Sequence, residues 1–174
     1  MSSIDLVILG MVLERPQSAY DIQKDVEYHN LSRWTQISTP SVYRKVIQLQ
    51  EMGYLQSEVV KGARMSEKTV YSLTESGKEY FHELMAFYAA QPVPLLFDFN
   101  VVISNLNKVP REQALALIAA LRAALKASAK ASESCAAEYA QIPLVGRTIF
   151  EQQRLLYGSL LEWLDHFEGQ FEQE

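Results

Sequence analysis

Hydrophobic and polar residues recur along this chain with two different spacings. Helical spacing predicts three helices near the start, over residues 3–14, 18–31 and 39–52. The spacing then changes to every second residue over 54–60 and 69–73, which predicts two strands joined by a hairpin. Three helices followed by a hairpin are typical of a winged helix-turn-helix, although the connection before the third helix is longer than a minimal turn.

The expected helix ends carry residues that favour starting or stopping a helix. Ser2 with Asp5, and Ser18 with Asp21, have the spacing of a capping box, in which each side chain bonds to the other residue's backbone amide. Gly53 is expected to end the third helix, because glycine adopts the left-handed backbone conformation without a steric penalty. These signals predict where the first two helices begin and where the third one ends.

The third helix is the predicted recognition helix of the helix-turn-helix. Thr39 is expected to cap it. Val42, Val46 and Leu49 recur on one side, which is expected to face the core. The opposite side carries two cations and no acid, and such side chains can reach phosphates and base edges, whereas an ordinary solvated face is the alternative for this helix alone. The residues predicted to contact DNA from this helix are Thr39, Ser41, Tyr43, Arg44, Lys45 and Gln48.

The predicted hairpin is rich in cations around its tip. Lys61, Arg64 and Lys68 lie there, and as parts of a wing they are expected to touch backbone phosphate or enter a minor groove. The stretch from Arg33 to Lys68 contains six cationic and three acidic residues, a local net charge of +3 in a chain whose net charge is −5. A basic patch on an acidic protein indicates that one face binds a polyanion, whereas a solvated hairpin tip is the alternative.

Two prolines, Pro92 and Pro94, mark the expected boundary between two domains. Residues 1–91 form the predicted DNA-binding domain, which closes with a helix after the second strand. Residues 92–174 show no strand pattern and are predicted to be all helical, beginning with a short apolar helix over 95–106.

Two long helices are predicted to follow, over 110–141 and from Pro143 nearly to the end of the chain. Their small and apolar residues alternate in steps of three and four, and the apolar stripe of the last helix is too wide for one partner. Part of this surface is therefore expected to meet a second copy of the chain. The residues predicted to contribute to dimerisation are Ile118, Leu121, Leu125, Leu156, Leu160, Trp163 and Phe167.

The composition is that of a globular protein. Of the 174 residues, 48% are hydrophobic and 21% are charged, close to the usual proportions. No apolar run approaches the roughly 20 residues that span a bilayer, and no basic leader precedes the first apolar stretch, so a cytoplasmic location is expected. The single cysteine, Cys135, agrees with a reducing compartment.

The sequence gives no sign of catalysis, of a metal or of another cofactor. The three histidines, His29, His82 and His166, lack carboxylate or cysteine partners at metal-ligand spacing. The chain holds neither a serine in a nucleophile-elbow pattern nor a glycine-rich phosphate loop. An enzyme is therefore the least favoured class.

A small aromatic ligand is a further hypothesis. The residues considered for lining its pocket are Trp34, Tyr139, Tyr157 and Trp163. For the last three, packing in a helical core is the stronger interpretation, because aromatic side chains dominate cores and interfaces. Trp34 lies just before the predicted recognition helix, between Arg33 and Thr35, so a ligand that touched it could tilt that helix.

Four short motifs occur together in the N-terminal half. They are Leu9-Gly10, Ser18-Ala19-Tyr20-Asp21-Ile22, Gly53-Tyr54-Leu55 and Tyr71-Ser72-Leu73-Thr74-Glu75-Ser76-Gly77. In this combination, residues 4–90 resemble the PadR family of bacterial transcriptional regulators. Ala19 stands where members often have glycine, a difference of little consequence inside a helix. The C-terminal half resembles, more weakly, the helical dimerisation region of longer members akin to virulence activators.

The resemblance implies a homodimer, usually a repressor, that binds a palindromic operator, and in some members a phenolic or other aromatic compound releases it. The sequence as a whole therefore predicts a mainly α protein, with a winged helix-turn-helix followed by an all-helical dimerisation domain, that acts as a PadR-like repressor. A winged-helix module that dimerises and binds protein is the alternative, since fold alone does not fix function.

Overall fold

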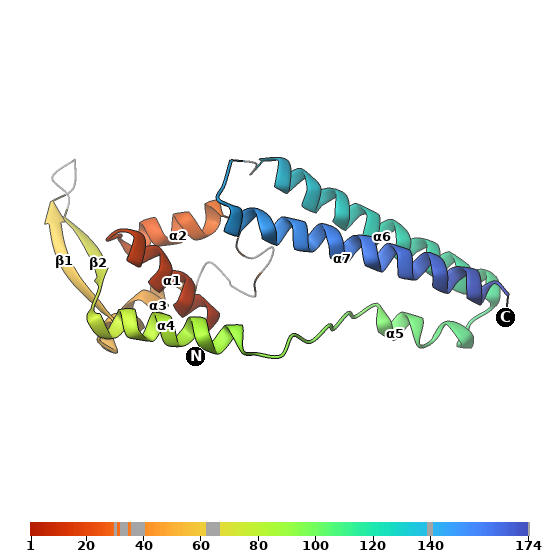
Figure 1. The fold of residues 1–174 in the computed structure, drawn as a ribbon, viewed down its shortest axis with the longest axis horizontal. Coiled ribbons are helices and arrows are strands. Elements are labelled where there is room, and N and C mark those ends of the chain that lie inside the picture. The colour runs from red at the N-terminus through yellow and green to blue at the C-terminus, as the bar shows by residue number, and fades with distance from the viewer. Residues whose placement is uncertain (30, 32–34, 36–40, 62–66, 139–140, 174) are drawn as a thin grey trace. The chain divides into compact units, whose positions relative to one another are not determined.

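The computed structural model describes residues 1–29, 31, 35, 41–61, 67–138 and 141–173. It divides the chain into two units, Met1–Val93 and Pro94–Glu174, which are described separately. Both are built mainly of helices, and a single two-stranded sheet occurs in the described part of the chain (Figure 1). The predicted fold class, a winged helix-turn-helix followed by a helical domain, is confirmed.

The N-terminal unit follows the predicted order of elements. These are α1 (Ser3–Glu14), α2 (Ala19–Tyr28), α3 (Ser41–Glu51), β1 (Leu55–Lys61), β2 (Glu67–Leu73) and α4 (Glu75–Ala89). The strands are antiparallel, with Leu55 opposite Leu73 at the base and Lys61 opposite Glu67 toward the tip (Figure 1).

The first helix lies at the centre of this unit. It packs against α3, α4 and β2, which explains why its apolar residues occupy more than one side. Ile8 and Leu9 are completely buried, together with Ile22 of α2, Leu49 of α3 and Leu84 of α4. This shared core fixes α3 against the rest of the unit.

One of the two predicted capping boxes is present. Ser18 accepts a hydrogen bond from the amide of Asp21, whose carboxylate accepts one from the amide of Ser18. The other prediction is wrong, because Ser2 caps α1 without a side-chain hydrogen bond and the carboxylate of Asp5 lies beside Lys45 instead. An ion pair inside the fold therefore replaces the local cap.

The predicted end of the recognition helix is confirmed at Gly53, whose φ of 78° is left-handed. The Gly53 carbonyl accepts hydrogen bonds from the hydroxyls of Thr74, at 2.7 Å, and Ser76, at 3.0 Å. Thr74 also caps α4 by accepting from the amide of Gly77. The end of α3 and the start of α4 are thereby joined at the base of the hairpin.

A backbone bridge ties the start of α2 to the second strand. The amide of Gln17 donates to the carbonyl of Tyr71 at 3.1 Å, and the amide of Tyr71 donates to the carbonyl of Gln17 at 2.8 Å. Because Ser18, the next residue, is the N-cap of α2, the first turn of that helix is held beside β2.

The C-terminal unit contains α5 (Asn100–Ile103), a 3-10 turn at Leu106–Lys108, α6 (Arg111–Glu138) and α7 (Leu144–Phe171). The predicted helix over 95–106 is wrong in extent, because only its last part is helical. Leu95 and Leu96 are exposed, so the first part lacks the packing on which a short helix depends.

The two long helices form an antiparallel pair (Figure 1). Arg122 of α6 bonds Asp165 at 2.7 Å and Glu168 at 2.5 Å near one end, and Ser132 donates to Gln153 at 2.7 Å nearer the other. Hydrogen bonds to these carboxylates raise the pKa of the Arg122 guanidinium, and Glu168 has a larger effect than Asp165. The predicted small-residue seam of α6 therefore packs on α7 of the same chain.

This pairing corrects part of the dimerisation prediction. Ile118, 1% exposed, and Leu125 are buried within the chain, so they are not available to a second copy. Leu121, Leu160 and Phe167 pack against the same core and are partly buried. The two predicted residues left on the outside are Leu156 and Trp163, which are 42% and 38% exposed.

Candidate nucleic-acid interface

The outward side of α3 is exposed, as the sequence predicts. Val42, Val46 and Leu49 are buried, whereas Tyr43 is 57% exposed. The face around Tyr43 is completed by Arg44, Ile47 and Gln48, which are also exposed. A long cation, an amide and a phenol on one helix face can donate to phosphate and to base edges. Thr39 and the side chain of Ser41 lie outside the part that the structure describes.

The predicted place of Lys45 on this face is wrong. Its Nζ lies 3.1 Å from Oδ1 of Asp5, and its side chain is only 21% exposed. Lys45 follows Val42 by three residues and directly precedes Val46, so helical geometry places it beside the buried stripe. Its charge is directed toward α1 and not away from the unit.

The wing cations differ in their surroundings. Lys61 is exposed at the end of β1, where it makes no ion pair with any described residue. Lys68 on β2 lies 2.6 Å from Asp21 of α2. Arg64 lies outside the described residues.

A hollow of about 490 Å³, which we call the α2–β2 notch, opens between the first turn of α2, the start of α3 and strand β2. The residues that line it are Ser18, Ala19, Tyr20, Asp21, Tyr43, Glu67, Lys68, Thr69 and Tyr71. Among them only Tyr43 and Lys68 are predicted DNA contacts. The bridge between Gln17 and Tyr71 joins two walls of this notch.

Two exposed residues of α2 near the notch were not predicted from the sequence as candidate DNA contacts. Tyr20 is largely exposed, and Nζ of Lys24 lies 4.9 Å from the centre of its ring. The neighbouring phenol of Tyr20 raises the pKa of Lys24. Their spacing of four residues on an exposed helix face is the sequence signal that could have identified them.

Ionisation in the notch follows from these contacts. For Asp21, partial burial raises the pKa, but hydrogen bonds from Lys68 and Ser18 outweigh it, so the pKa lies below its usual value. Burial raises the pKa of the Tyr71 phenol, and the nearby Tyr43 raises it further. At neutral pH, Asp21 is therefore a carboxylate and Tyr71 a neutral hydroxyl donor.

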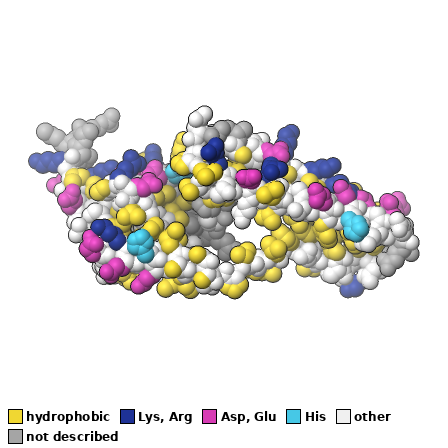
Figure 2. Space-filling view, in the orientation of Figure 1, with side chains coloured by type: hydrophobic (Ala, Val, Ile, Leu, Met, Phe, Trp, Pro, Cys, Tyr) yellow, Lys and Arg dark blue, Asp and Glu magenta, His cyan; other side chains and the backbone are white. Residues whose placement is uncertain are grey.

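Folding reduces the local positive charge counted along the sequence. Asp5 and Asp21 lie outside the stretch that gave +3, yet they pair with Lys45 and Lys68. Arg44 and Lys61 remain as exposed cations without an ion pair to any described residue. Figure 2 accordingly shows Lys and Arg side chains with acidic side chains close to them at the hairpin end of the N-terminal unit.

The residues proposed to line a ligand pocket are not brought together. Trp34 and Tyr139 lie outside the described part of the chain. Tyr157 packs on the core of the C-terminal unit, and Trp163 stacks on Phe167 with ring centres 6.0 Å apart.

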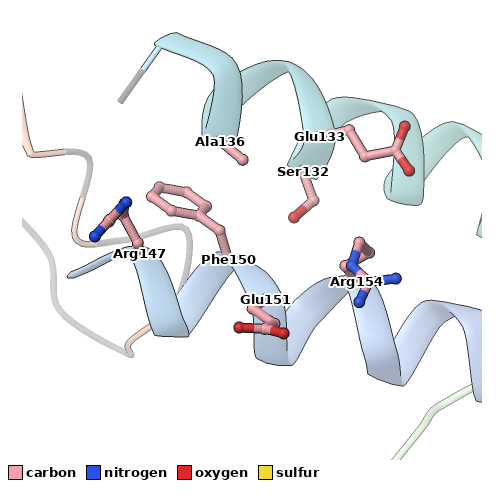
Figure 3. A pocket seen from close by; sticks show the side chains of 7 residues that line it. All are labelled: Ser132, Glu133, Ala136, Arg147, Phe150, Glu151 and Arg154. Carbon is pink, nitrogen blue, oxygen red and sulfur yellow. The ribbon is translucent and has the colours of Figure 1, made fainter. Parts of the chain in front are cut away.

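A different hollow, of about 360 Å³, opens between α6 and α7 near the turn that joins them. Phe150 points across it toward Ala136, with Arg147 and Arg154 on either side (Figure 3). Neither Tyr157 nor Trp163 lines this hollow.

Within the described residues, no group of three or more histidine, cysteine or acidic side chains could hold a metal ion. The helices among these residues also lack the length and apolar character that a membrane span requires.

An exposed helix face beside a two-stranded wing defines the N-terminal unit as a winged helix-turn-helix of the kind that places one helix in a DNA groove. Residues 8–83 match the transcriptional regulator PadR-like family. The match lies within the winged-helix unit and confirms the resemblance drawn from the sequence.

Solved structures share the fold over the whole chain. Bacillus subtilis PadR in complex with operator DNA is 19% identical, with a TM-score of 0.77 over 98% of this chain and 99% of that one. The same protein in complex with p-coumaric acid gives 16% identity and a TM-score of 0.79 over 98% and 96%. The Vibrio cholerae virulence activator AphA gives 19% identity and a TM-score of 0.69 over 98% of both chains. Among proteins of curated function, none matches this sequence.

Proposed function

We propose that this chain is a transcriptional repressor that binds a palindromic operator as a homodimer. The single observation that carries the proposal is the outward face of α3, where Tyr43, Arg44 and Gln48 are exposed over a buried apolar stripe. The family model that the unit matches, and the operator DNA bound to Bacillus subtilis PadR, support the same partner. Arg44 is the residue that we expect to read a base, because it is the one cation on this face without an ion pair to a described residue.

The wing is proposed to contact the DNA backbone. Lys61 has no acidic partner among the described residues and lies toward the tip of the hairpin. A lysine that neutralises one phosphate contributes affinity without sequence preference, and its loss lowers the salt dependence of binding.

The homodimer is proposed to form through the C-terminal unit. Leu155, Leu156 and Trp163 on α7 remain exposed after α6 has covered the apolar stripe of that helix. Large apolar side chains grouped on one exposed helix indicate a protein contact. Two-fold symmetry would set two copies of α3 one DNA turn apart, about 34 to 36 Å, or a multiple of that spacing.

Release by a small aromatic effector completes the proposal. Bacillus subtilis PadR has been crystallised with p-coumaric acid, a compound of this class. Phenolic acids titrated into the complex of this protein with DNA would test release directly: we expect dissociation at a saturating concentration of the effector, whereas an unchanged complex would overturn this step.

The experiment that tests DNA binding is a gel shift with duplex DNA from the region upstream of the protein's own gene. We expect a site-specific, salt-sensitive shift, and Arg44→Ala should weaken it by roughly 1–3 kcal/mol and relax base choice. Binding that bulk DNA competes away without any preferred site would instead favour a winged-helix module that binds protein.

A further inference from the structure

One apolar side chain lies on the outward face of the recognition helix. Ile47 is 36% exposed, whereas the other described isoleucines of the N-terminal unit are at most 6% exposed, namely Ile4, Ile8 and Ile22. A single exposed apolar residue is ordinary on a protein surface, so exposure alone assigns it no role. The position of Ile47 on α3 is what distinguishes it.

Contacts on both sides of the buried stripe fix the rotation of α3. On one side, Nζ of Lys45 lies 3.1 Å from Oδ1 of Asp5 on α1. On the other side, Nε2 of Gln50 donates to the hydroxyl of Ser57 on β1 at 3.0 Å. Helical geometry places Ile47 outside the arc that these residues enclose. Its side chain therefore cannot turn into the core without breaking these contacts.

Ile47 lies beside the polar residues that we expect to contact DNA from this face. It follows Tyr43 by four positions and Arg44 by three, so the three side chains occupy adjacent turns of one face. Glu51 is exposed at the last residue of α3, and phosphate would repel its charge. The part of the face that we expect to enter a groove is therefore the first two turns, and Ile47 lies in the second.

The chemistry of isoleucine limits what this position can read. Its side chain has neither a donor nor an acceptor, so it cannot bond to a phosphate or to the polar edge of a base. The apolar group that a base pair presents in the major groove is the 5-methyl group of thymine. Contact between this methyl group and an alkyl side chain removes both from water, which favours thymine over bases that lack the group.

We propose that Ile47 is a specificity-determining residue, which selects one thymine in each half-site of the operator through contact with the 5-methyl group. This inference rests on the proposed function and adds an apolar determinant to the polar ones. Three residues rise about 4.5 Å along a helix, and successive bases rise about 3.4 Å along a strand. The selected thymine should therefore lie within about two base pairs of the base that Arg44 reads.

The first experiment removes the methyl group from the DNA. In the duplex that gives the site-specific shift, each thymine is replaced in turn by deoxyuridine, which pairs in the same way and lacks only the 5-methyl group. Wild-type protein should bind about two- to fivefold more weakly when the selected thymine of one half-site is replaced. Undiminished binding to every one of these duplexes would overturn the proposal.

The second experiment changes Ile47 and thereby assigns the effect to this residue. Ile47→Ala should bind the thymine and deoxyuridine duplexes equally well at the selected position, because the methyl group has lost its partner. Ile47→Val keeps a branched apolar side chain and should retain the dependence on the methyl group. Leu13→Ala is the control, since Leu13 is 45% exposed on α1 and its truncation should leave that dependence unchanged. Both alanine variants should keep the fold, because alanine favours helices.

The outcomes separate this inference from the proposed function. If deoxyuridine weakens binding of Ile47→Ala as much as it weakens binding of wild type, another residue contacts the methyl group and the proposal is overturned. The site-specific shift of the wild-type protein would still support operator binding in that case. If wild-type protein shows no preferred site, the proposed function fails and the inference about Ile47 fails with it.

Discussion

Nζ of Lys45 on the recognition helix lies 3.1 Å from Oδ1 of Asp5 on the central helix α1, and the Asp5 side chain is almost completely buried. This oxygen has no hydrogen-bond partner among the described residues, so charge holds the contact. The ion pair joins two helices that also share Ile8, Leu9 and Leu49 in the core. It sets the rotation of α3 and thereby helps to decide which of its residues face outward.

Lys45→Met should therefore act on stability more than on DNA. Removing Lys45 leaves a buried carboxylate without its counter-charge, which we expect to cost about 2 kcal/mol, less than a fully buried pair because Lys45 keeps some exposure. Urea denaturation of the full chain, followed by circular dichroism, measures this. Lys78→Met, which removes an exposed pair, should stay within about 1 kcal/mol of wild type. Equal stability of the two variants would contradict the role of the buried pair.

Gly77→Ala should separate the start of α4 from the end of α3. A Cβ atom at this position would lie 2.1 Å from the carbonyl oxygen of Tyr54, which is backbone and cannot rotate aside. We expect a loss of about 3 kcal/mol, as in other overpacked sites. Gly10→Ala is the control, because its Cβ would meet Phe81 at an ordinary 3.5 Å, and it should be neutral or slightly stabilising inside α1. Thermal denaturation of both variants measures this, and equal melting temperatures would contradict the predicted clash at Gly77.

The stability contributed by Asp21 should depend on pH in a defined direction. Its pKa is lower in the folded chain than the ordinary value of 3.8, so the carboxylate stabilises the fold above that value. The contribution is lost as the pH falls through the lower, folded-state pKa. The melting temperature of wild type should exceed that of Asp21→Asn at pH 7, and the difference should shrink below pH 4. A difference that stays constant down to pH 3 would show that protonation of Asp21 is not the cause.

Leu156→Glu should weaken the proposed dimer. Leu156 is 42% exposed on α7, so glutamate can be accommodated in the monomer but not in an apolar interface. Light scattering after size exclusion should show a shift from dimer to monomer. Leu13→Glu makes the same change on α1 at a site that is 45% exposed, and it should leave the oligomeric state unchanged. A dimeric Leu156→Glu variant would remove this residue from the proposed interface.

Local signals in the sequence predicted the local structure well. The capping box at Ser18 and the left-handed Gly53 each depend on a few neighbouring residues, and both are present. The capping box expected at Ser2 is absent, because Asp5 pairs with Lys45 instead. The two strands lie where the spacing of every second residue predicted them, with ends that differ by at most two positions, although burial does not alternate along either strand. These features need no knowledge of the distant chain.

Long-range pairing is what the sequence pattern missed. Asp5 meets Lys45 across forty positions, and Asp21 meets Lys68 across forty-seven, so a charge count within one stretch overstated the free cations. Likewise, the steps of three and four around Ile118 predicted an apolar seam correctly. They could not say whether its partner is α7 of the same chain or a second copy.

The hairpin is anchored at its base from two sides, by Tyr71 on Gln17 and by Thr74 on Gly53. Neither anchor involves the stretch between Lys61 and Glu67. Insertions and deletions there should consequently be tolerated without turning α3, so that the length of the wing can change during evolution independently of the bases that α3 is proposed to read.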